Sequence, residues 1–292
     1  MHIAWLGKKS PFCGNVTYSR EITNALSARG HRISFLHFAD SHESQSNDAH
    51  EVSLPCIYKS QGYTIPTLKA SKVLSDALTN LRPDLVHASL TLSPLDFRLP
   101  EICQQLGIPL VATFHPPFDS KVRNFKSSAQ LLAYQFYAPF LARYNRVIIF
   151  SYLQRELLIK LGVPAAKLAV IPNGVDEDRY LPGYSEIKHE LNCDRLFVYQ
   201  GRIATAKNVE ALLKAWKSAR MGKRSKLLIV GDGPLAENLK NTYRCESNTV
   251  WFGFVASEAR RIEILKGADV FILPSLVEGL SLSLLEAMAC GV

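Results

Sequence analysis

Hydrophobic and polar positions follow two different patterns along the first part of the chain. Short apolar runs rich in β-branched and aromatic residues predict buried strands. These runs lie at residues 2–6, 31–38, 83–89, 109–115 and 146–151. Residues 15–30 instead repeat apolar side chains at helical spacing and end at Gly30, which predicts a helix. Residues 40–51 are polar and predict a surface loop.

The same alternation restarts in the second part of the chain. Strands are predicted at residues 196–201, 225–233, 249–254 and 269–275, with amphipathic helices at residues 208–219, 234–243 and 258–268. Strands that alternate with helices favour parallel sheets. A turn cluster of Pro172, Asn173 and Gly174 separates the two parts. The sequence therefore predicts an α/β protein with two domains, residues 1–172 and 173–292.

Composition narrows the class of protein without naming an activity. The chain has 292 residues, of which 47% are hydrophobic. No apolar run approaches the roughly 20 residues that a membrane span needs. The apolar stretch before Lys8 and Lys9 is too short for a signal peptide. Six scattered cysteines without metal-ligand spacing indicate reduced thiols and a cytoplasmic location.

Positive charge is concentrated in the first part of the chain. Residues 1–175 carry 18 Lys and Arg against 11 Asp and Glu, whereas residues 176–292 carry 16 against 15. A basic surface suits nucleic acid, an anionic membrane or an acidic substrate. No zinc-finger or RNA-binding motif supports nucleic acid as a partner. A membrane surface or an anionic substrate therefore remains.

Two loops that follow predicted strands carry residues suited to phosphate. In "GDGP", residues 231–234, Gly231 permits a tight turn and a close approach of a ligand, although many strand-to-helix turns contain such glycines. In "QGRIATAKN", residues 200–208, Arg202 and Lys207 lie at the carboxyl end of a strand, where open α/β sheets bind ligands. A guanidinium and an ammonium that converge there suit a diphosphate. The alternative is a solvated loop with two ordinary basic residues.

Two glutamates lie eight positions apart in "EGLSLSLLEAMACG", residues 278–291. Ser283 and Glu286 fit a capping box at the start of a helix, which would explain Glu286 structurally. Glu278 lies outside that helix and has no such explanation. A carboxylate accepts hydrogen bonds from the vicinal hydroxyls of a sugar or a ribose, and a helix N-terminus attracts phosphate. A cap and a ligand role for Glu286 can coexist.

Together, "GRIATAK", "PNGVD", "VGDGP" and "FILPSLVEGLSLSLLEAMACG" resemble the motifs of retaining GT-B glycosyltransferases of family 4, in that family's order and spacing. The resemblance covers essentially the whole chain and includes the family's glutamate pair, E-x7-E. It implies two Rossmann-like parallel-sheet domains that face a cleft. The first would be the acceptor side, and the second would bind a nucleotide sugar for a retaining hexosyl transfer.

The resemblance implies a role for each charged residue of these motifs. Arg202 and Lys207 would hold the diphosphate of the donor. Glu286 would bind the ribose, and Glu278 would contact the donor sugar and help to position it.

Glycines and a histidine complete the implied site. The backbone would approach the donor at Gly14, Gly231 and Gly291. Gly14 follows the first strand, where the family commonly has two glycines and this chain has Cys13 in place of the first. His115 lies where many members carry a histidine that meets the donor sugar. His87 matches another frequent histidine, for which we expect a structural role.

The implied chemistry needs no metal ion. No DxD-type motif or His/Cys cluster suggests one, and members of this type generally work without it. Basic side chains and helix N-termini would stabilise the leaving diphosphate. The donor would be a nucleotide-diphosphate sugar, with a UDP-sugar favoured. The resemblance implies front-side attack, with the departing phosphate acting as the base.

The acceptor is suggested by the segment 117–146, which combines basic and aromatic residues as membrane interfaces do. Most of its aromatic residues are expected to pack into the core, but packing does not explain the basic loop with Lys121, Arg123 and Lys126. "IAWLGKKSPFCGNVTYSREITNAL", "YKSQGYTIPTLKA" and "HASLTLSPLDF" are similar to cyanobacterial digalactosyldiacylglycerol synthases. That similarity implies galactosyl transfer to monogalactosyldiacylglycerol by an enzyme that contacts the cytosolic face of a membrane peripherally.

Two other classes share the donor motifs. One is a soluble family 4 glycosyltransferase that makes an oligosaccharide or a sucrose-type product, and the other is a non-catalytic nucleotide-sugar-binding protein. A Rossmann dehydrogenase is disfavoured, since no G-x-G-x-x-G follows a strand.

The helix predicted near Ser283 is short and apolar up to the last residue. We therefore expect a fragment that is incomplete in its second domain and inactive in transfer.

Overall fold

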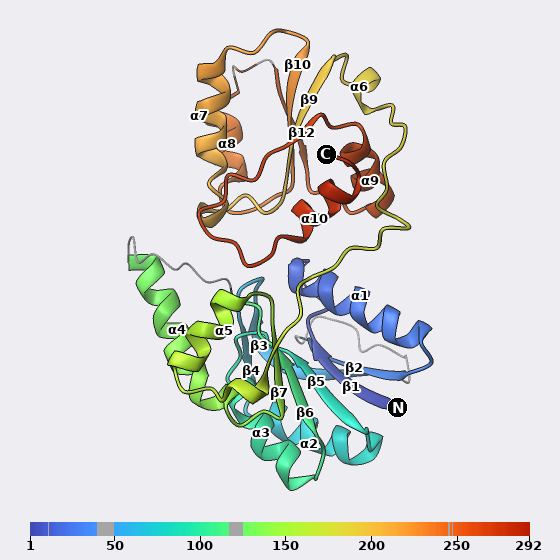
Figure 1. Ribbon diagram of the computed structural model, residues 1–292, viewed down its shortest axis with the longest axis vertical. Coiled ribbons are helices and arrows are strands. Elements are labelled where there is room, and N and C mark those ends of the chain that lie inside the picture. The colour runs from blue at the N-terminus through green and yellow to red at the C-terminus, as the bar shows by residue number, and fades with distance from the viewer. Residues whose placement is uncertain (11, 40–49, 117–124, 245, 247) are drawn as a thin grey trace. The chain divides into compact units, whose positions relative to one another are not determined.

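The structure is a computed structural model that describes residues 1–10, 12–39, 50–116, 125–244, 246 and 248–292. The chain separates into two compact units, Met1–Pro172 and Asn173–Val292 (Figure 1). The junction falls in the turn cluster at which the sequence was divided. The predicted α/β class with parallel sheets is confirmed in each unit.

The first unit is built on an eight-stranded sheet. Its elements are β1 His2–Gly7, α1 Gly14–Ala28, β2 Arg32–Ala39, β3 Glu51–Lys59, β4 Thr64–Pro66, α2 Ala70–Leu81, β5 Leu85–Ser89, α3 Leu95–Gln105, β6 Leu110–Thr113, α4 Phe125–Leu141, β7 Arg146–Ile149, α5 Tyr152–Lys160, the 3₁₀ turn Ala165–Lys167 and β8 Leu168–Val170. The strands lie in the order β4-β3-β2-β1-β5-β6-β7-β8. Neighbouring strands are parallel except for β3 and β4. The carboxyl ends of β1, β5 and β6 therefore lie along one edge.

Strand β1 illustrates why the apolar runs form strands here. All six of its residues are buried, because helices cover both faces of a parallel sheet and leave no polar side to the strand. The following helix α1 ends as predicted, with Gly30 at φ +82 just after the C-cap residue Arg29. Only a residue that tolerates positive φ closes a helix in this way without strain.

The second unit contains a smaller sheet. Its elements are α6 Ile187–Glu190, β9 Arg195–Gln200, the 3₁₀ turn Thr205–Lys207, α7 Val209–Ala219, β10 Ser225–Val230, α8 Ala236–Thr242, β11 Thr249–Gly253, α9 Glu258–Lys266, β12 Val270–Phe271 and α10 Leu282–Ala289. The strands lie in the order β11-β10-β9-β12, and each neighbouring pair is parallel.

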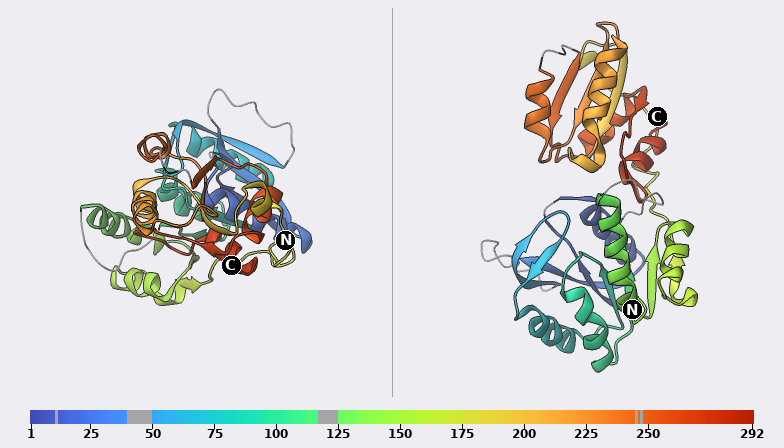
Figure 2. Two further views of the ribbon diagram at one scale, coloured as in Figure 1. Left: turned by 90° about the horizontal axis from the view of Figure 1, so that it is seen from above. Right: turned by 90° about the vertical axis from the view of Figure 1, so that its left-hand side faces the viewer.

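Each face of this second sheet has its own apolar cluster. Leu227 and Ile229 of β10 pack with residues of α7 and α8, whereas Leu228 and Val230 pack with residues of α9 and α10. Alternate side chains of a strand point to opposite faces, so a continuous apolar run serves both layers. Figures 1 and 2 show these helices on the two sides of the sheet.

The prediction that most aromatic residues of helix α4 pack into the core is confirmed for Tyr134 and Tyr137. Tyr134 and Tyr137 are buried in the core of the first unit, with Tyr134 packed edge-on against Phe114. Two apolar residues on the same helix, Leu132 and Phe136, are exposed. Helix α4 therefore presents one apolar face to the core and part of another to solvent.

Candidate functional site

The loop after β9 carries the two basic residues that the sequence singled out. Arg202 lies two residues beyond the end of β9, and Lys207 ends the 3₁₀ turn that follows. Tyr199 Oη donates a 2.7 Å hydrogen bond to the backbone carbonyl of Arg202, which holds the loop in place. In the described part of the chain, no side chain or carbonyl bonds to the exposed Arg202 guanidinium. The guanidinium is thus available at the carboxyl edge of the sheet.

Lys207 meets one of the two glutamates. Its Nζ lies 2.5 Å from Glu278 Oε1, and the two side chains are 27% and 24% exposed. The loops that carry them are joined by a 2.9 Å backbone hydrogen bond from Leu276 N to the carbonyl of Ala206. Burial, and then the negative charge of Glu278, raises the pKa of Tyr199. The fold therefore brings together the cation suited to a diphosphate and the carboxylate suited to a sugar.

Glu286 has a different neighbour, and the capping box predicted for it is wrong. The N-cap of α10 is Ser281, whose Oγ accepts a 3.4 Å hydrogen bond from Leu284 N. Ser281 has the extended backbone that an N-cap needs, whereas Ser283 already lies in the first turn. Glu286 is then too far along the helix to close the box. Its Oε2 instead accepts a 3.1 Å hydrogen bond from Gln200 Nε2, at the end of β9.

The turn after β10 needs glycine for its geometry. Gly231 has φ +133, and a Cβ atom there would lie 1.9 Å from the carbonyl oxygen of Gly201. Gly233 has φ +158, and its Cβ would lie 2.5 Å from the carbonyl oxygen of Ile203. The tight turn predicted from "GDGP" is therefore present, and it holds the loops after β9 and β10 in backbone contact.

The other two candidate glycines, Gly291 and Gly14, lie in different local structures. Gly291 has φ +88 and follows the C-cap of α10. Its N–H donates to the carbonyl of Met288, and Val292 N donates to that of Ala287, which is a Schellman motif. Gly14, the first residue of α1, has no left-handed backbone, and a Cβ there would meet nothing within 4 Å. Helix closure thus accounts for Gly291, and open space adjoins Gly14.

In the first unit, His115 belongs to a chain of hydrogen bonds at the carboxyl edge of the sheet. Ser89 Oγ lies 2.8 Å from His115 Nε2 and donates a 2.8 Å hydrogen bond to Asn15 Oδ1. Asn15 is fixed in turn, since its Nδ2 donates to the carbonyl of Leu90 at 3.2 Å. The ring of Tyr18 packs edge-on against His115 at 4.9 Å between centroids.

This network assigns the proton on His115. The single hydroxyl proton of Ser89 is given to Asn15, so the hydroxyl accepts from His115 and the imidazole must carry its proton on Nε2. Burial, followed by repulsion from His87 and Lys8, lowers the pKa of His115 to about 3. The ring is therefore neutral near pH 7, with an unprotonated Nδ1.

His87 has the structural role expected of it. Its Nε2 lies 2.9 Å from Thr113 Oγ1, and its ring stacks on Trp5 at 4.0 Å between centroids. Burial lowers the pKa of His87 to about 3. In the unfolded chain His87 binds a proton below its ordinary pKa of about 6.5, but in the folded protein it stays neutral down to about pH 3. Stability contributed by the neutral His87 is therefore fully present above pH 6.5 and is lost as pH falls toward 3.

A substitution of His87 isolates this effect. In His87→Phe, which keeps a stacked ring, we expect the pH dependence of the unfolding free energy between about pH 4 and 6 to be shallower by about 1.4 kcal/mol per pH unit. Burial raises the pKa of Asp96 to about 6, so Asp96 makes the unfolding free energy fall with rising pH in this range. Both proteins contain Asp96, so its effect cancels in the comparison. Urea unfolding at several pH values measures the slope. Equal slopes would contradict the assignment, whatever the absolute stability of the variant.

Several functional partners were not identified from the sequence. Gln200 is hydrogen-bonded to Glu286 and Ser89 to His115, whereas Asn15 is hydrogen-bonded to Ser89. Each of the three is an ordinary polar residue. One signal was available: Ser89 and Gln200 are the last residues of parallel strands, which is where ligand sites form in open α/β sheets.

The side chains of the basic loop of the membrane prediction fall outside the part of the chain that the structure describes. Lys121 and Arg123 lie outside the described residues, as does the side chain of Lys126. Among the residues that are described, no three His, Cys, Asp or Glu side chains are grouped so as to hold a metal ion. Within that same part of the chain, no helix is long and apolar enough to cross a membrane.

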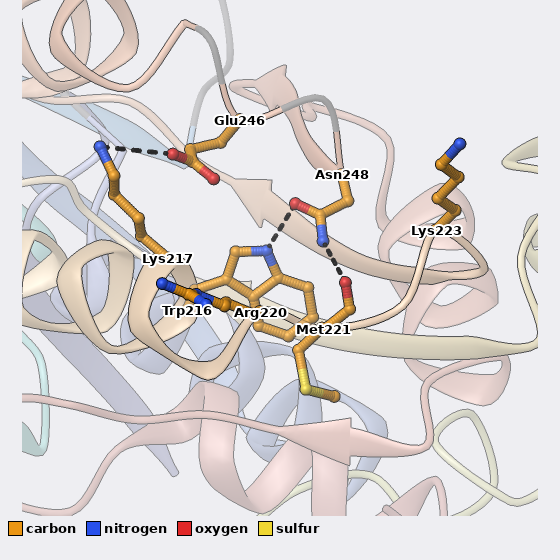
Figure 3. Close-up of a pocket in the computed structure, with 7 residues that line it drawn as sticks. All are labelled: Trp216, Lys217, Arg220, Met221, Lys223, Glu246 and Asn248. Carbon is orange, nitrogen blue, oxygen red and sulfur yellow. Dashed lines mark hydrogen bonds and ion pairs between the residues drawn. The ribbon is translucent and has the colours of Figure 1, made fainter.

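A cavity of about 230 Å³ in the second unit lies away from these residues. It is lined by Trp216, Lys217, Arg220, Met221, Lys223, Glu246 and Asn248 (Figure 3). Met221 and Asn248 precede β10 and β11, so the cavity is at the amino ends of these strands. The candidate residues gather at the opposite, carboxyl ends, where ligands of open α/β sheets bind.

Comparison with known proteins identifies similar sequences along most of the chain. Residues 13–179 match the family "Glycosyltransferase Family 4", and residues 185–292 match "Glycosyl transferases group 1". The chain is 31% identical over 239 residues to the Escherichia coli UDP-Gal:α-D-GlcNAc-diphosphoundecaprenol α-1,3-galactosyltransferase. This alignment covers 78% of this chain and 61% of the relative. The chain is also 25% identical over 249 residues to an Arabidopsis thaliana sulfoquinovosyl transferase, covering 82% of this chain and 47% of the relative. The chain thus spans less than two thirds of the length of either relative.

Solved structures show the same fold. Sucrose-phosphate synthase from Thermosynechococcus elongatus aligns with a TM-score of 0.72 at 20% identity, covering 100% of this chain and 79% of that one. Anabaena HepE in complex with UDP-glucose aligns with a TM-score of 0.74 at 18% identity, with the same coverage. The two units are therefore the Rossmann-like domains of a GT-B fold. The match to "Glycosyltransferase Family 4" covers more than half of this chain, and the chain therefore belongs to glycosyltransferase family 4.

Proposed function

We propose that the protein transfers a hexose from a nucleotide-diphosphate sugar to an acceptor, with retention of the anomeric configuration. The contact between Lys207 and Glu278 carries this proposal, because it joins a cation for the diphosphate to a carboxylate for sugar hydroxyls. Arg202 would bind the diphosphate with Lys207. Glu286, beside Gln200, would accept hydrogen bonds from the ribose. No metal ion is assigned a part in this proposal.

In the first unit, His115 would contact the donor sugar. Its neutral ring has an unprotonated Nδ1, which can accept a hydrogen bond from a sugar hydroxyl. The open space beside Gly14 would let the backbone at the start of α1 approach the donor. The first turn of a helix offers unpaired N–H groups to an anion.

We propose a UDP-sugar as the donor and a lipid-linked sugar as the acceptor. The Escherichia coli relative is named for UDP-Gal and for a diphosphoundecaprenol-linked acceptor, which supports both choices. Similarity of three stretches to digalactosyldiacylglycerol synthases favours galactosyl transfer to monogalactosyldiacylglycerol. The basic excess of residues 1–175 suits peripheral contact with an anionic, cytosolic membrane face.

Nucleotide affinity tests the donor site. Arg202→Ala removes a charge-assisted contact, so we expect affinity for UDP to fall by about one to two decades. Lys223→Ala, which removes an exposed cation at the amino ends of the strands, serves as the control and should leave affinity unchanged. Calorimetric titration with UDP, GDP and ADP gives both values. Equal affinities in Arg202→Ala and the parent protein would refute the assignment of Arg202.

Turnover of the whole protein with a panel of donors and acceptors tests the reaction itself. We expect galactose from UDP-galactose on monogalactosyldiacylglycerol in mixed micelles, and none on free sugars. Transfer to a soluble sugar instead would identify an oligosaccharide-forming enzyme. Binding of a UDP-sugar without transfer to any acceptor would identify a binding protein.

A further inference from the structure

An exposed apolar surface lies on the β3–β4 hairpin and the loop after it, and Gln61 in the turn of this hairpin donates a 2.9 Å hydrogen bond to the carbonyl of Phe12, in the loop that leads to Gly14. Its members are large apolar side chains in one short segment: Ile57, Tyr58, Tyr63, Ile65 and Leu68. Leu68 is fully exposed, and Ile57 is 71% exposed. We call these five residues the hairpin patch. Contiguous exposed apolar surface on a folded protein marks a site of interaction.

The pairing of the two strands explains why Tyr58, Tyr63 and Ile65 share a surface. Tyr58 lies directly opposite Ile65 in the antiparallel ladder, and its ring lies 5.6 Å from that of Tyr63. Thr64, between Tyr63 and Ile65, is buried on the other face. Ile57 is the extra residue where the register shifts between Cys56 and Tyr58. The strand pairing therefore makes the side chains on this face of the hairpin point toward solvent.

Positive charge adjoins the hairpin patch. Lys69 and Lys72, at the start of α2, are exposed, and neither forms an ion pair with any described residue. Between residues 52 and 75 the sequence contains no Asp or Glu. Lys59, in contrast, is turned inward and donates a 2.7 Å hydrogen bond to Ser10 Oγ. Lys69 and Lys72 thus border the hairpin patch, and the next carboxylate along the chain is Asp76, one turn further along α2.

The edge strand is poorly suited to pairing with another chain. β4 has only three residues and ends in Pro66, which has no N–H to donate. A second copy would gain few backbone hydrogen bonds there. Tyrosines beside aliphatic side chains and lysines suit a membrane interface, because each tyrosine has an apolar body and a polar tip.

We propose that the hairpin patch docks on an anionic lipid surface. Leu68 and Ile57 enter the boundary between headgroups and acyl chains, and Lys69 and Lys72 contact anionic headgroups. This proposal rests on the lipid acceptor of the proposed function and names the surface that reaches it. That surface is distinct from residues 117–146.

Vesicle binding tests this surface without any donor or acceptor. In Tyr63→Asn with Leu68→Asn, we expect the partition coefficient onto phosphatidylglycerol-containing vesicles to fall about tenfold or more. The matched control is Leu181→Asn with Tyr184→Asn, which removes one exposed aliphatic and one exposed tyrosine from the second unit and should bind as the parent does. Lys69→Gln with Lys72→Gln should lower the partition coefficient about fivefold per charge at low salt. The measurement is co-sedimentation, with thermal melting to confirm that each variant is folded.

Three results would overturn the proposal. The first is a parent protein that does not bind anionic vesicles at low salt. The second is a hairpin variant that binds as well as its matched control. The third is a hairpin variant that dissociates a dimer, which would identify a second copy as the occupant. Affinity for UDP, measured on the same proteins, separates the two proposals: vesicle binding without nucleotide binding would refute the donor site and leave the hairpin surface standing.

Discussion

Turnover of the whole protein should fall about a hundredfold or more in Glu278→Gln, while affinity for UDP is retained or increases. The carboxylate is the partner of Lys207 at 2.5 Å. Replacing it by an amide leaves a polar group of the same shape but removes the charge that the ammonium now faces. The ammonium is then free for a diphosphate, so ground-state binding of the nucleotide does not suffer. The loss should therefore be seen in kcat and not in nucleotide affinity.

The control for this experiment is another glutamate in an ion pair of the same unit. Glu210 Oε1 lies 2.8 Å from Lys214 Nζ on the exposed surface of α7. Such a pair contributes little, so Glu210→Gln should change neither turnover nor affinity. Steady-state transfer and calorimetric titration with UDP give the two quantities. Loss of UDP affinity with turnover per bound donor kept would rule out a role for Glu278 at the sugar.

Stability, in contrast, should depend most strongly on Gly231. Any side chain there would bring a Cβ to 1.9 Å from the carbonyl oxygen of Gly201, at a backbone φ of +133. The neighbouring atom is backbone and cannot rotate away, so the loops after β9 and β10 must separate. We expect Gly231→Ala to lower the unfolding free energy of the second unit by about 3 kcal/mol or more, and to abolish UDP binding because Arg202 follows Gly201.

A second glycine provides the matched control. A Cβ at Gly222 would meet nothing within 4 Å, so Gly222→Ala should change stability by less than about 1 kcal/mol. Denaturant unfolding followed by tryptophan fluorescence reports on this unit through Trp216 and Trp251. If the two alanine variants unfold at the same denaturant concentration, Gly231 does not have the strained geometry described here.

Some elements escaped prediction for a physical reason. β3 contains Pro55 and α3 contains Pro100, and a proline within a pattern argues against a regular element there. Both are tolerated because neighbouring elements bury the surrounding side chains. β12 is shorter than the predicted strand, at Val270–Phe271, because it pairs with β9 alone at the edge of the sheet.

The sequence by itself determined the α/β class, the division into two units and the carboxyl-edge position of Arg202, Lys207 and Glu278. Apolar periodicity is local, and the parallel order of strands follows from their alternation with helices. Only the tertiary structure decided which side chains meet. The contact from Gln200 to Glu286 spans 86 positions and that from Asn15 to Ser89 spans 74. No local pattern encodes such pairs, because their geometry depends on how strands and helices distant in sequence pack together.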